Sequence, residues 1–123
     1  MRFEHAPDIE GRIHALVTRL SLKHIDPARV KCFRSYGSKA RAYARIWSLP
    51  RVWQKALSVR SHYVIEVLHE HFDKQAHDDQ TRTLIHELLH IPKTFSGATR
   101  PHAFFDERID KRAVEKYYLM LRD

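Results

Sequence analysis

The chain has 123 residues, of which 43% are hydrophobic and 30% are charged, so it is long enough for one domain with one apolar core. Its formal net charge is +7, and no stretch approaches the roughly 20 apolar residues that a membrane span needs. The single cysteine excludes an intramolecular disulfide, and the N-terminal residues lack the apolar segment of a signal peptide. We therefore expect residues 1–123 to form a single domain in a cytoplasmic protein that does not enter a membrane.

The first half of the chain predicts a helix followed by two strands. Apolar residues recur at helical spacing over residues 9–20, and Asp8 is the candidate cap of this helix. Alternating apolar and polar residues predict a strand over residues 30–37 and a second strand over residues 43–47. Pro50 can open a short helix or turn after the second strand.

The second half predicts a strand and two helices. Residues 62–72 are rich in Tyr, Val, Ile and Phe, and their charged residues alternate with apolar ones, a pattern that suits an edge strand. The aspartates at residues 78–79 can cap the next helix, which Pro92 ends after His90. Asp106 can cap a final amphipathic helix. The order of elements predicts an α+β domain with a short, mostly antiparallel sheet flanked by N- and C-terminal helices.

The helix that ends before Pro92 contains a His-Glu-x-x-His motif, formed by His86, Glu87 and His90. His86 and His90 lie one turn apart on the same helix face, so both imidazoles can bind one Zn²⁺ ion at about 2.0–2.1 Å. Glu87 lies about 100° further round the helix, where its carboxylate can take a proton from a water that the metal activates. The neighbouring apolar residues fall between about 160° and 300° from His86, on the opposite side of the helix. Two surface histidines on an amphipathic helix are the alternative interpretation.

The motif belongs to a longer specific pattern, His86-Glu87-Leu88-Leu89-His90-Ile91-Pro92 followed by Phe95-x-Gly97 and Arg100-Pro101-His102. With this pattern the chain resembles the phage and archaeal metallopeptidase family, a small zincin group similar in layout to the SprT-like proteases and the minigluzincins. The resemblance implies a zincin-like fold, one Zn²⁺ per chain and hydrolysis of peptide bonds in a protein or peptide substrate. In related zincins an edge strand holds an extended substrate by β-augmentation. If this carries over, the strand before the motif helix forms the floor of the substrate cleft, through Val64, Ile65, Glu66 and Val67.

A catalytic zinc ion takes three protein ligands, and we predict His102 as the third. Gly97 and Pro101 allow the chain to turn back before His102, and the resemblance also implies a histidine after Arg-Pro at this point. Arg100 is the nearest candidate to stabilise the oxyanion, with a structural role as the alternative. One alternative is a carboxylate downstream, because a following helix completes the site in gluzincins, and the candidates are Asp106, Glu107 and Asp110. The other alternative is a site without a third protein ligand.

The basic residues are concentrated in one segment. Residues 29–60 contain nine Lys or Arg, no Asp or Glu, and five interleaved aromatic residues. This composition is typical of a surface where phosphates pair with cations and bases stack on rings, and the candidate residues are Arg41, Arg45 and Arg51. Basic residues solvated around an aromatic core are the alternative. A second class of function is therefore a basic nucleic-acid-binding protein whose metal-binding helix is structural or non-catalytic.

Overall fold

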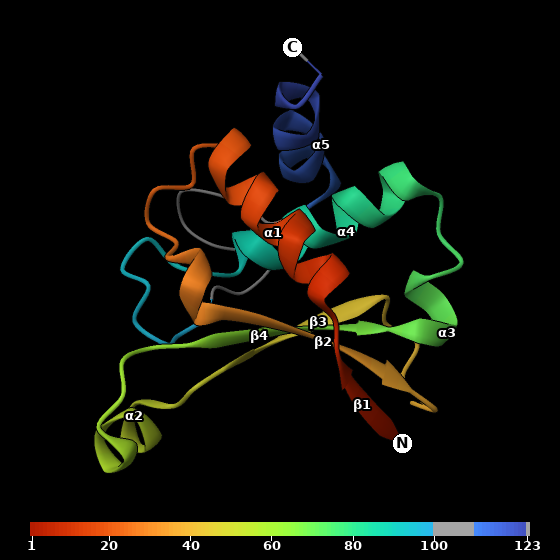
Figure 1. Ribbon diagram of the computed structural model, residues 1–123. Helices are drawn as coiled ribbons and strands as arrows, with labels where there is room; N and C mark the ends of the chain where they lie inside the picture. The colour runs from red at the N-terminus through yellow and green to blue at the C-terminus, as the bar shows by residue number, and fades with distance from the viewer. Residues whose placement is uncertain (100–109, 123) are drawn as a thin grey trace.

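The computed structural model describes residues 1–99 and 110–122, and Figure 1 shows its helices gathered mainly on one side of a twisted sheet. The sheet has four strands in the order β1-β2-β4-β3. The strands are β1 (Arg2–His5), β2 (Val30–Tyr36), β3 (Ala44–Ser48) and β4 (Tyr63–Leu68). The α-helices are α1 (Pro7–Arg19), α2 (Arg51–Leu57), α3 (His69–Phe72), α4 (His77–Leu89) and α5 (Lys111–Met120), and a 3₁₀ turn, η1 (Pro27–Arg29), precedes β2.

The α+β class and the flanking N- and C-terminal helices are confirmed. The sheet is mixed, because β1 and β3 pair antiparallel with their neighbours whereas β2 and β4 pair parallel. Sequence analysis missed β1, since its four residues are all exposed and give no alternation between apolar and polar positions.

The strand before the motif helix, β4, is an inner strand, and the prediction that it forms an edge is wrong. It pairs with β2 on one side and with β3 on the other. It also ends at Leu68, and the residues expected to continue it form the short helix α3. The edge strand beside β4 is β3, which comes earlier in the chain.

The edge prediction was wrong because the charge of Glu66 suggested that this residue is exposed to solvent. Its side chain is only 1% exposed, although a carboxylate normally stays in water. Arg45 on β3 donates hydrogen bonds from Nε and Nη2 to the two carboxylate oxygens at 3.0 and 3.2 Å, and Trp47 donates from Nε1 at 2.8 Å. These donors replace the water that the carboxylate loses, so Glu66 can lie inside the sheet.

The main core fills the space between the inner face of the sheet and the helices α1 and α4. Its most buried members come from these layers and include Ile9, Ile13, Val30, Ile65, Leu84, Ile85 and Leu88. Cys32 on β2 is buried among them, as expected, and burial raises the pKa of its thiol to about 12. The thiol is therefore protonated and unreactive at neutral pH.

The helix boundaries differ slightly from those predicted. Helix α4 begins one residue before Asp78, with Ala76 as its N-cap, so Asp78 lies in the first turn and not at the cap. Asp106 lies outside the described residues, and the N-cap of α5 is Asp110, which accepts a hydrogen bond from the Ala113 backbone N–H at 3.0 Å. Among the helices of residues 1–99 and 110–122, none is long and apolar enough to cross a membrane.

We expect Glu66→Gln to destabilise the protein by about 1–3 kcal/mol at neutral pH, because a neutral amide replaces the charged acceptor of Arg45. Burial raises the pKa of Glu66, but the hydrogen bonds from Arg45 and Trp47 outweigh burial and leave this pKa below its usual range. The stabilisation is therefore present above the unfolded-state pKa and is lost as the pH falls through the folded-state pKa. Urea unfolding of both proteins at neutral pH and at about pH 3 measures this change. A stability difference that stays the same at both pH values would contradict it.

Candidate metal centre

The last two turns of α4 carry the two histidines of the motif. Leu84, Ile85 and Leu88 are almost completely buried against the core, so the opposite side of the helix faces away from the core. His86 lies on that side, and His90 follows as the C-cap residue, where Pro92 prevents a further helical turn. The sequence therefore places both imidazoles at the same end of the helix and on the same face.

The imidazole nitrogens of His86 and His90 converge, with an Nε2 to Nε2 distance of 3.3 Å. The rings are tilted by 63°, with their centroids 5.1 Å apart. Two zinc–nitrogen bonds of about 2.0–2.1 Å at a tetrahedral angle require the same two atoms to lie about 3.3–3.4 Å apart. The pair therefore fits two corners of a tetrahedral metal site.

Glu87 lies beside the histidines and is 7% exposed. Burial raises the pKa of its carboxyl to about 7. A cation bound nearby would act in the opposite direction, because it stabilises the carboxylate form. This placement suits a group that must accept and release a proton close to a metal.

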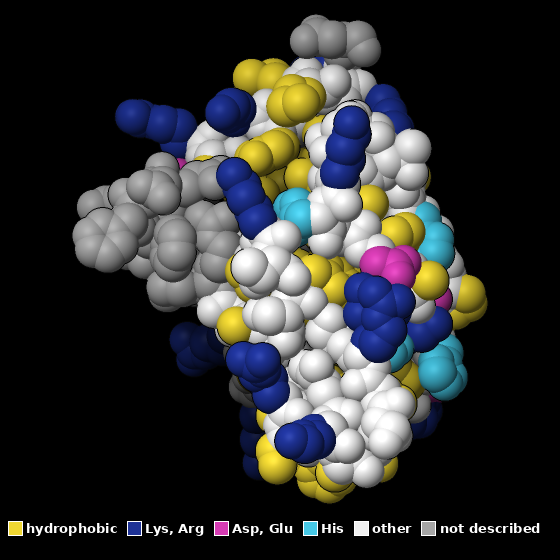
Figure 2. All heavy atoms as spheres, turned by 90° about the vertical axis from the view of Figure 1, so that its left-hand side faces the viewer, with side chains coloured by type: hydrophobic (Ala, Val, Ile, Leu, Met, Phe, Trp, Pro, Cys, Tyr) yellow, Lys and Arg dark blue, Asp and Glu magenta, His cyan; other side chains and the backbone are white. Residues whose placement is uncertain are grey.

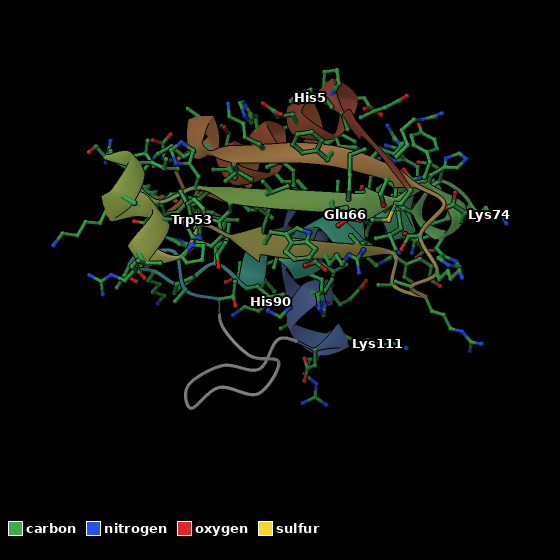
Figure 3. All side chains as sticks on the ribbon, turned by 90° about the horizontal axis from the view of Figure 1, so that it is seen from below. His5, Trp53, Glu66, Lys74, His90 and Lys111 are labelled. Atoms are coloured by element: carbon green, nitrogen blue, oxygen red, sulfur yellow. The ribbon has the colours of Figure 1, made fainter. Side chains whose placement is uncertain are left out.

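The three motif residues line a cleft of about 1590 Å³ between the sheet edge and the helices. One wall is β3, through Ala44, Arg45 and Ile46, and α5 contributes a second wall. In Figure 3, His90 and Lys111 lie on the β3 side of the sheet, whereas Lys74 lies at the end near α3. A chain segment that entered this cleft would therefore lie between β3 and the histidines.

The outer edge of β3 presents backbone hydrogen-bonding groups to this cleft. The bonds from Leu68 N to Tyr43 O and from Leu49 N to His62 O show that the odd-numbered residues of this segment bond to β4. In an antiparallel pair the alternate residues point the other way. The backbone N–H and C=O groups of Ala44, Ile46 and Ser48 therefore point away from β4.

The residues predicted to hold substrate do not reach the cleft. Val64 and Glu66 point to the outer face of the sheet, whereas Ile65 and Val67 are buried on its inner face. None of the four lines the cleft, because β3 lies between β4 and the sheet edge. The strand that borders the cleft is therefore β3 and not β4.

The described residues do not complete a three-ligand metal site. In residues 1–99 and 110–122 no group of three or more His, Cys, Asp or Glu side chains is arranged to hold a metal ion. His102 and Arg100, like the alternative ligands Asp106 and Glu107, lie outside these residues. Asp110 lines the cleft, but one of its oxygens caps α5.

Sequence analysis did not identify Tyr63, which controls the path of the chain after α4. Its buried hydroxyl donates to the Ala98 carbonyl at 2.7 Å and accepts from the Gly97 N–H at 2.9 Å. Gly97 has a φ of 100°, and a Cβ there would lie 2.9 Å from the Leu49 carbonyl oxygen. These contacts hold the loop against the sheet, and Thr99 then lines the cleft. An aromatic residue at the start of a strand gives no sequence signal for this role.

The three arginines predicted to bind nucleic acid do not form one cluster. Arg45 lies in the middle of β3 and pairs with Glu66. Arg41 and Arg51 are exposed, but they lie beyond opposite ends of β3. Arg45 therefore has a structural role as the partner of Glu66, whereas Arg41 and Arg51 are exposed at the surface.

No curated protein and no solved structure matches the chain significantly. A family model does match, over nearly the whole length of the chain and including every residue of the His-Glu-x-x-His motif. The model is described as "Putative phage metallopeptidase" and matches residues 1–120, so the chain belongs to this family.

Proposed function

We propose that this chain is a zinc-dependent peptidase whose centre is formed by His86, Glu87, His90 and His102. The family description implies a metal ion and a peptidase. The observation that carries the proposal is the 3.3 Å separation of the two Nε2 atoms, beside a buried glutamate and along a cleft bounded by a sheet edge. Imidazole ligands favour zinc over the hard cations Mg²⁺ and Ca²⁺.

His102 is the third ligand in this proposal because both ends of the intervening segment lie at the cleft. Thr99 and Asp110 line the same cleft as the two histidines. His102 is three positions after Thr99 in the sequence, and an extended chain of that length spans about 10 Å. The hydrogen bonds of Tyr63 to Gly97 and Ala98 fix the loop just before Thr99. The position from which the chain continues toward His102 is therefore defined.

In the proposed reaction the histidines bind the metal ion and Glu87 transfers the proton. A metal ion held by His86, His90 and His102 would supply Lewis-acid chemistry to the scissile carbonyl and to the attacking water. Glu87 accepts the proton from this water and passes it to the leaving amine. Burial shields the carboxyl group from bulk solvent, so the proton stays near the reacting atoms. Arg100 is the proposed donor to the oxyanion.

The substrate in this proposal is an extended peptide that pairs with β3. The backbone groups of Ala44, Ile46 and Ser48 point away from β4, and Ala44 and Ile46 line the cleft. Such an edge accepts an additional strand through main-chain hydrogen bonds. The scissile bond would then lie between the edge of β3 and the face of α4 that carries Glu87.

The metal ligands can be tested by substitution. We expect His86→Ala, His90→Ala and His102→Ala each to lower zinc affinity by about 100-fold or more, because each removes a metal bond. His77→Ala is the matched control, since His77 lies on the same helix with its side chain 78% exposed. Zinc per chain after dialysis, and competition with a chelator, measure the effect.

Two outcomes would change this ligand set. Wild-type zinc content in His86→Ala or His90→Ala would mean that the two rings only hydrogen-bond to each other. Retained zinc in His102→Ala together with lost zinc in Asp110→Asn would assign the third position to a carboxylate.

Peptidase activity is tested by Glu87→Gln, which should keep zinc and lose at least about 10²–10⁴-fold in cleavage rate, because the amide cannot accept the proton. Glu115→Gln is the control, since Glu115 lines the same cleft on α5 and has no proposed role in proton transfer. Mass spectrometry of an unstructured peptide library incubated with each protein measures cleavage. Wild-type cleavage by Glu87→Gln, or no cleavage by the zinc-loaded wild type, would overturn the proposal.

The substrate strand is tested by two proline substitutions within β3, one at a residue whose N–H points away from β4 and one at a residue whose N–H bonds to β4. Ile46→Pro removes an N–H that points away from β4, so the protein should fold and KM should rise by about 2–10-fold, with a smaller effect on kcat. Trp47→Pro removes an N–H that bonds to β4 and should lower the midpoint of urea unfolding instead. An unchanged KM in folded Ile46→Pro would exclude β3 as the substrate strand.

A further inference from the structure

The outer face of the sheet is open. Helices α1, α4 and α5 lie above the sheet in Figure 1, and α2 lies below it at one end. Figure 3 looks onto the opposite face, where Glu66 lies near the middle and Trp53 lies at the end where α2 is placed. Within the described part of the chain no helix lies across this face. We call it, together with α2, the open face.

Aromatic rings gather on the open face. Phe33 and Trp47 lie on this side of the sheet, since each follows a residue that packs into the core, and His5 pairs with Phe33 in the register. The rings of His5 and Phe33 lie 4.4 Å apart. Trp47 is 53% exposed and Trp53 on α2 is 56% exposed, and these are the two tryptophans of the chain.

The indole of Trp47 is held in place although it is exposed. Its Nε1 donates to Glu66, and the Arg45 guanidinium lies 5.6 Å from the ring centroid. A ring that is already ordered loses little conformational entropy when a planar ligand stacks on it. The buried Glu66 carboxylate is neutralised by Arg45, so it offers no strong repulsion to an anion on this face.

The cations around these rings suit an anionic ligand. Lys31 on β2 and Arg51 and Lys55 on α2 are exposed, and none of them forms an ion pair within the described residues. Lys31 shares a row of the sheet with Trp47 across β4, which places the two backbones about 10 Å apart. At the lower end of Figure 2, where α2 lies, Lys and Arg side chains stand beside hydrophobic ones.

We propose that the open face binds single-stranded nucleic acid, with bases stacked on Trp47, Trp53 and Phe33 and phosphates bound by Lys31, Arg51 and Lys55. A four-stranded sheet with exposed rings is a known way to bind unpaired bases, and flanking cations track the backbone. A duplex would not suit this face, because its bases are stacked on one another and cannot reach the rings. Recognition through ring faces and phosphates gives little sequence preference.

This site is separate from the proposed metal centre. On β3, Ile46 lines the cleft beside α4, whereas Trp47 points to the open face. The two ligands would therefore occupy opposite faces of the same strand. Nucleic-acid binding can be measured without any measurement of peptidase activity.

The test is a titration of the full chain with a dT oligonucleotide of about 15 nucleotides at low salt. Both tryptophans belong to the proposed site, so stacking should quench the intrinsic fluorescence. A U oligonucleotide of the same length and a duplex of the same length form the parallel arms. We expect quenching by one or both single strands and weaker binding of the duplex. No binding at low salt, or tighter binding of the duplex, would overturn the proposal.

Two triple variants distinguish binding by the cations of the open face from an effect of the net charge of the protein. Lys31→Gln, Arg51→Gln and Lys55→Gln together should weaken binding and reduce the slope of log affinity against log salt by about 2. The control changes three exposed cations away from the open face and lowers the net charge equally: Lys23→Gln, Arg112→Gln and Lys116→Gln. An equal loss of oligonucleotide affinity in both triple variants would mean that binding depends only on net charge, which would overturn the proposed site.

Stacking is tested by Trp53→Ala, which should weaken binding about fivefold or more, because each stacked base contributes separately. Leu119→Ala is the control, since Leu119 is an exposed apolar residue on α5. Far-UV circular dichroism verifies that both variants fold. Unchanged affinity in folded Trp53→Ala would remove α2 from the site. In a competition experiment, an acidic protein that fully displaces the oligonucleotide would assign the open face to a protein partner instead.

Discussion

The burial of one side of α4 is the constraint on which the rest of the site depends. Leu84, Ile85 and Leu88 can leave water only if this side packs on the core, and together with the neighbouring apolar residues they exclude the histidines from it. Hydrophobic burial thus orients the two histidine side chains that we propose as metal ligands. The C-terminal stop at Pro92 adds a second constraint, because the chain must leave the helix directly after His90. The Nε2 separation of 3.3 Å is the result of helix geometry and packing acting together.

Strand β3 links the features of the sheet. Its inner side contributes Ala44 and Ile46 to the cleft, its outer side contributes Arg45 and Trp47 to the buried Glu66, and its edge carries the backbone groups that point away from β4. A carboxylate inside the sheet is costly unless it is hydrogen-bonded, so Glu66 ties β3 to β4 through side chains as well as through the ladder. The edge that faces α4 is thereby held in a fixed register.

The loop after α4 is shaped by contacts with segments far earlier in the chain. Tyr63 accepts from the Gly97 N–H and donates to the Ala98 carbonyl. Ser61 donates to the Phe95 carbonyl at 2.6 Å, and Gln54 donates to the Ser96 carbonyl at 3.3 Å. Each partner lies more than 30 residues away in sequence. The direction in which the chain leaves α4 is therefore set by tertiary contacts with the start of β4 and with α2.

The sequence by itself determined the class of fold, the helix with His86, Glu87 and His90, and the buried state of Cys32, because these follow from periodicity and residue type over a few turns. It also pointed to a metallopeptidase family, which the family match confirms. Only the tertiary structure decided which strand is the edge. The charge of Glu66 suggested exposure, and this signal misled because its partners Arg45 and Trp47 come from β3, about 20 residues away. Strand order and the pairing of buried charges depend on long-range contacts, which local patterns do not encode.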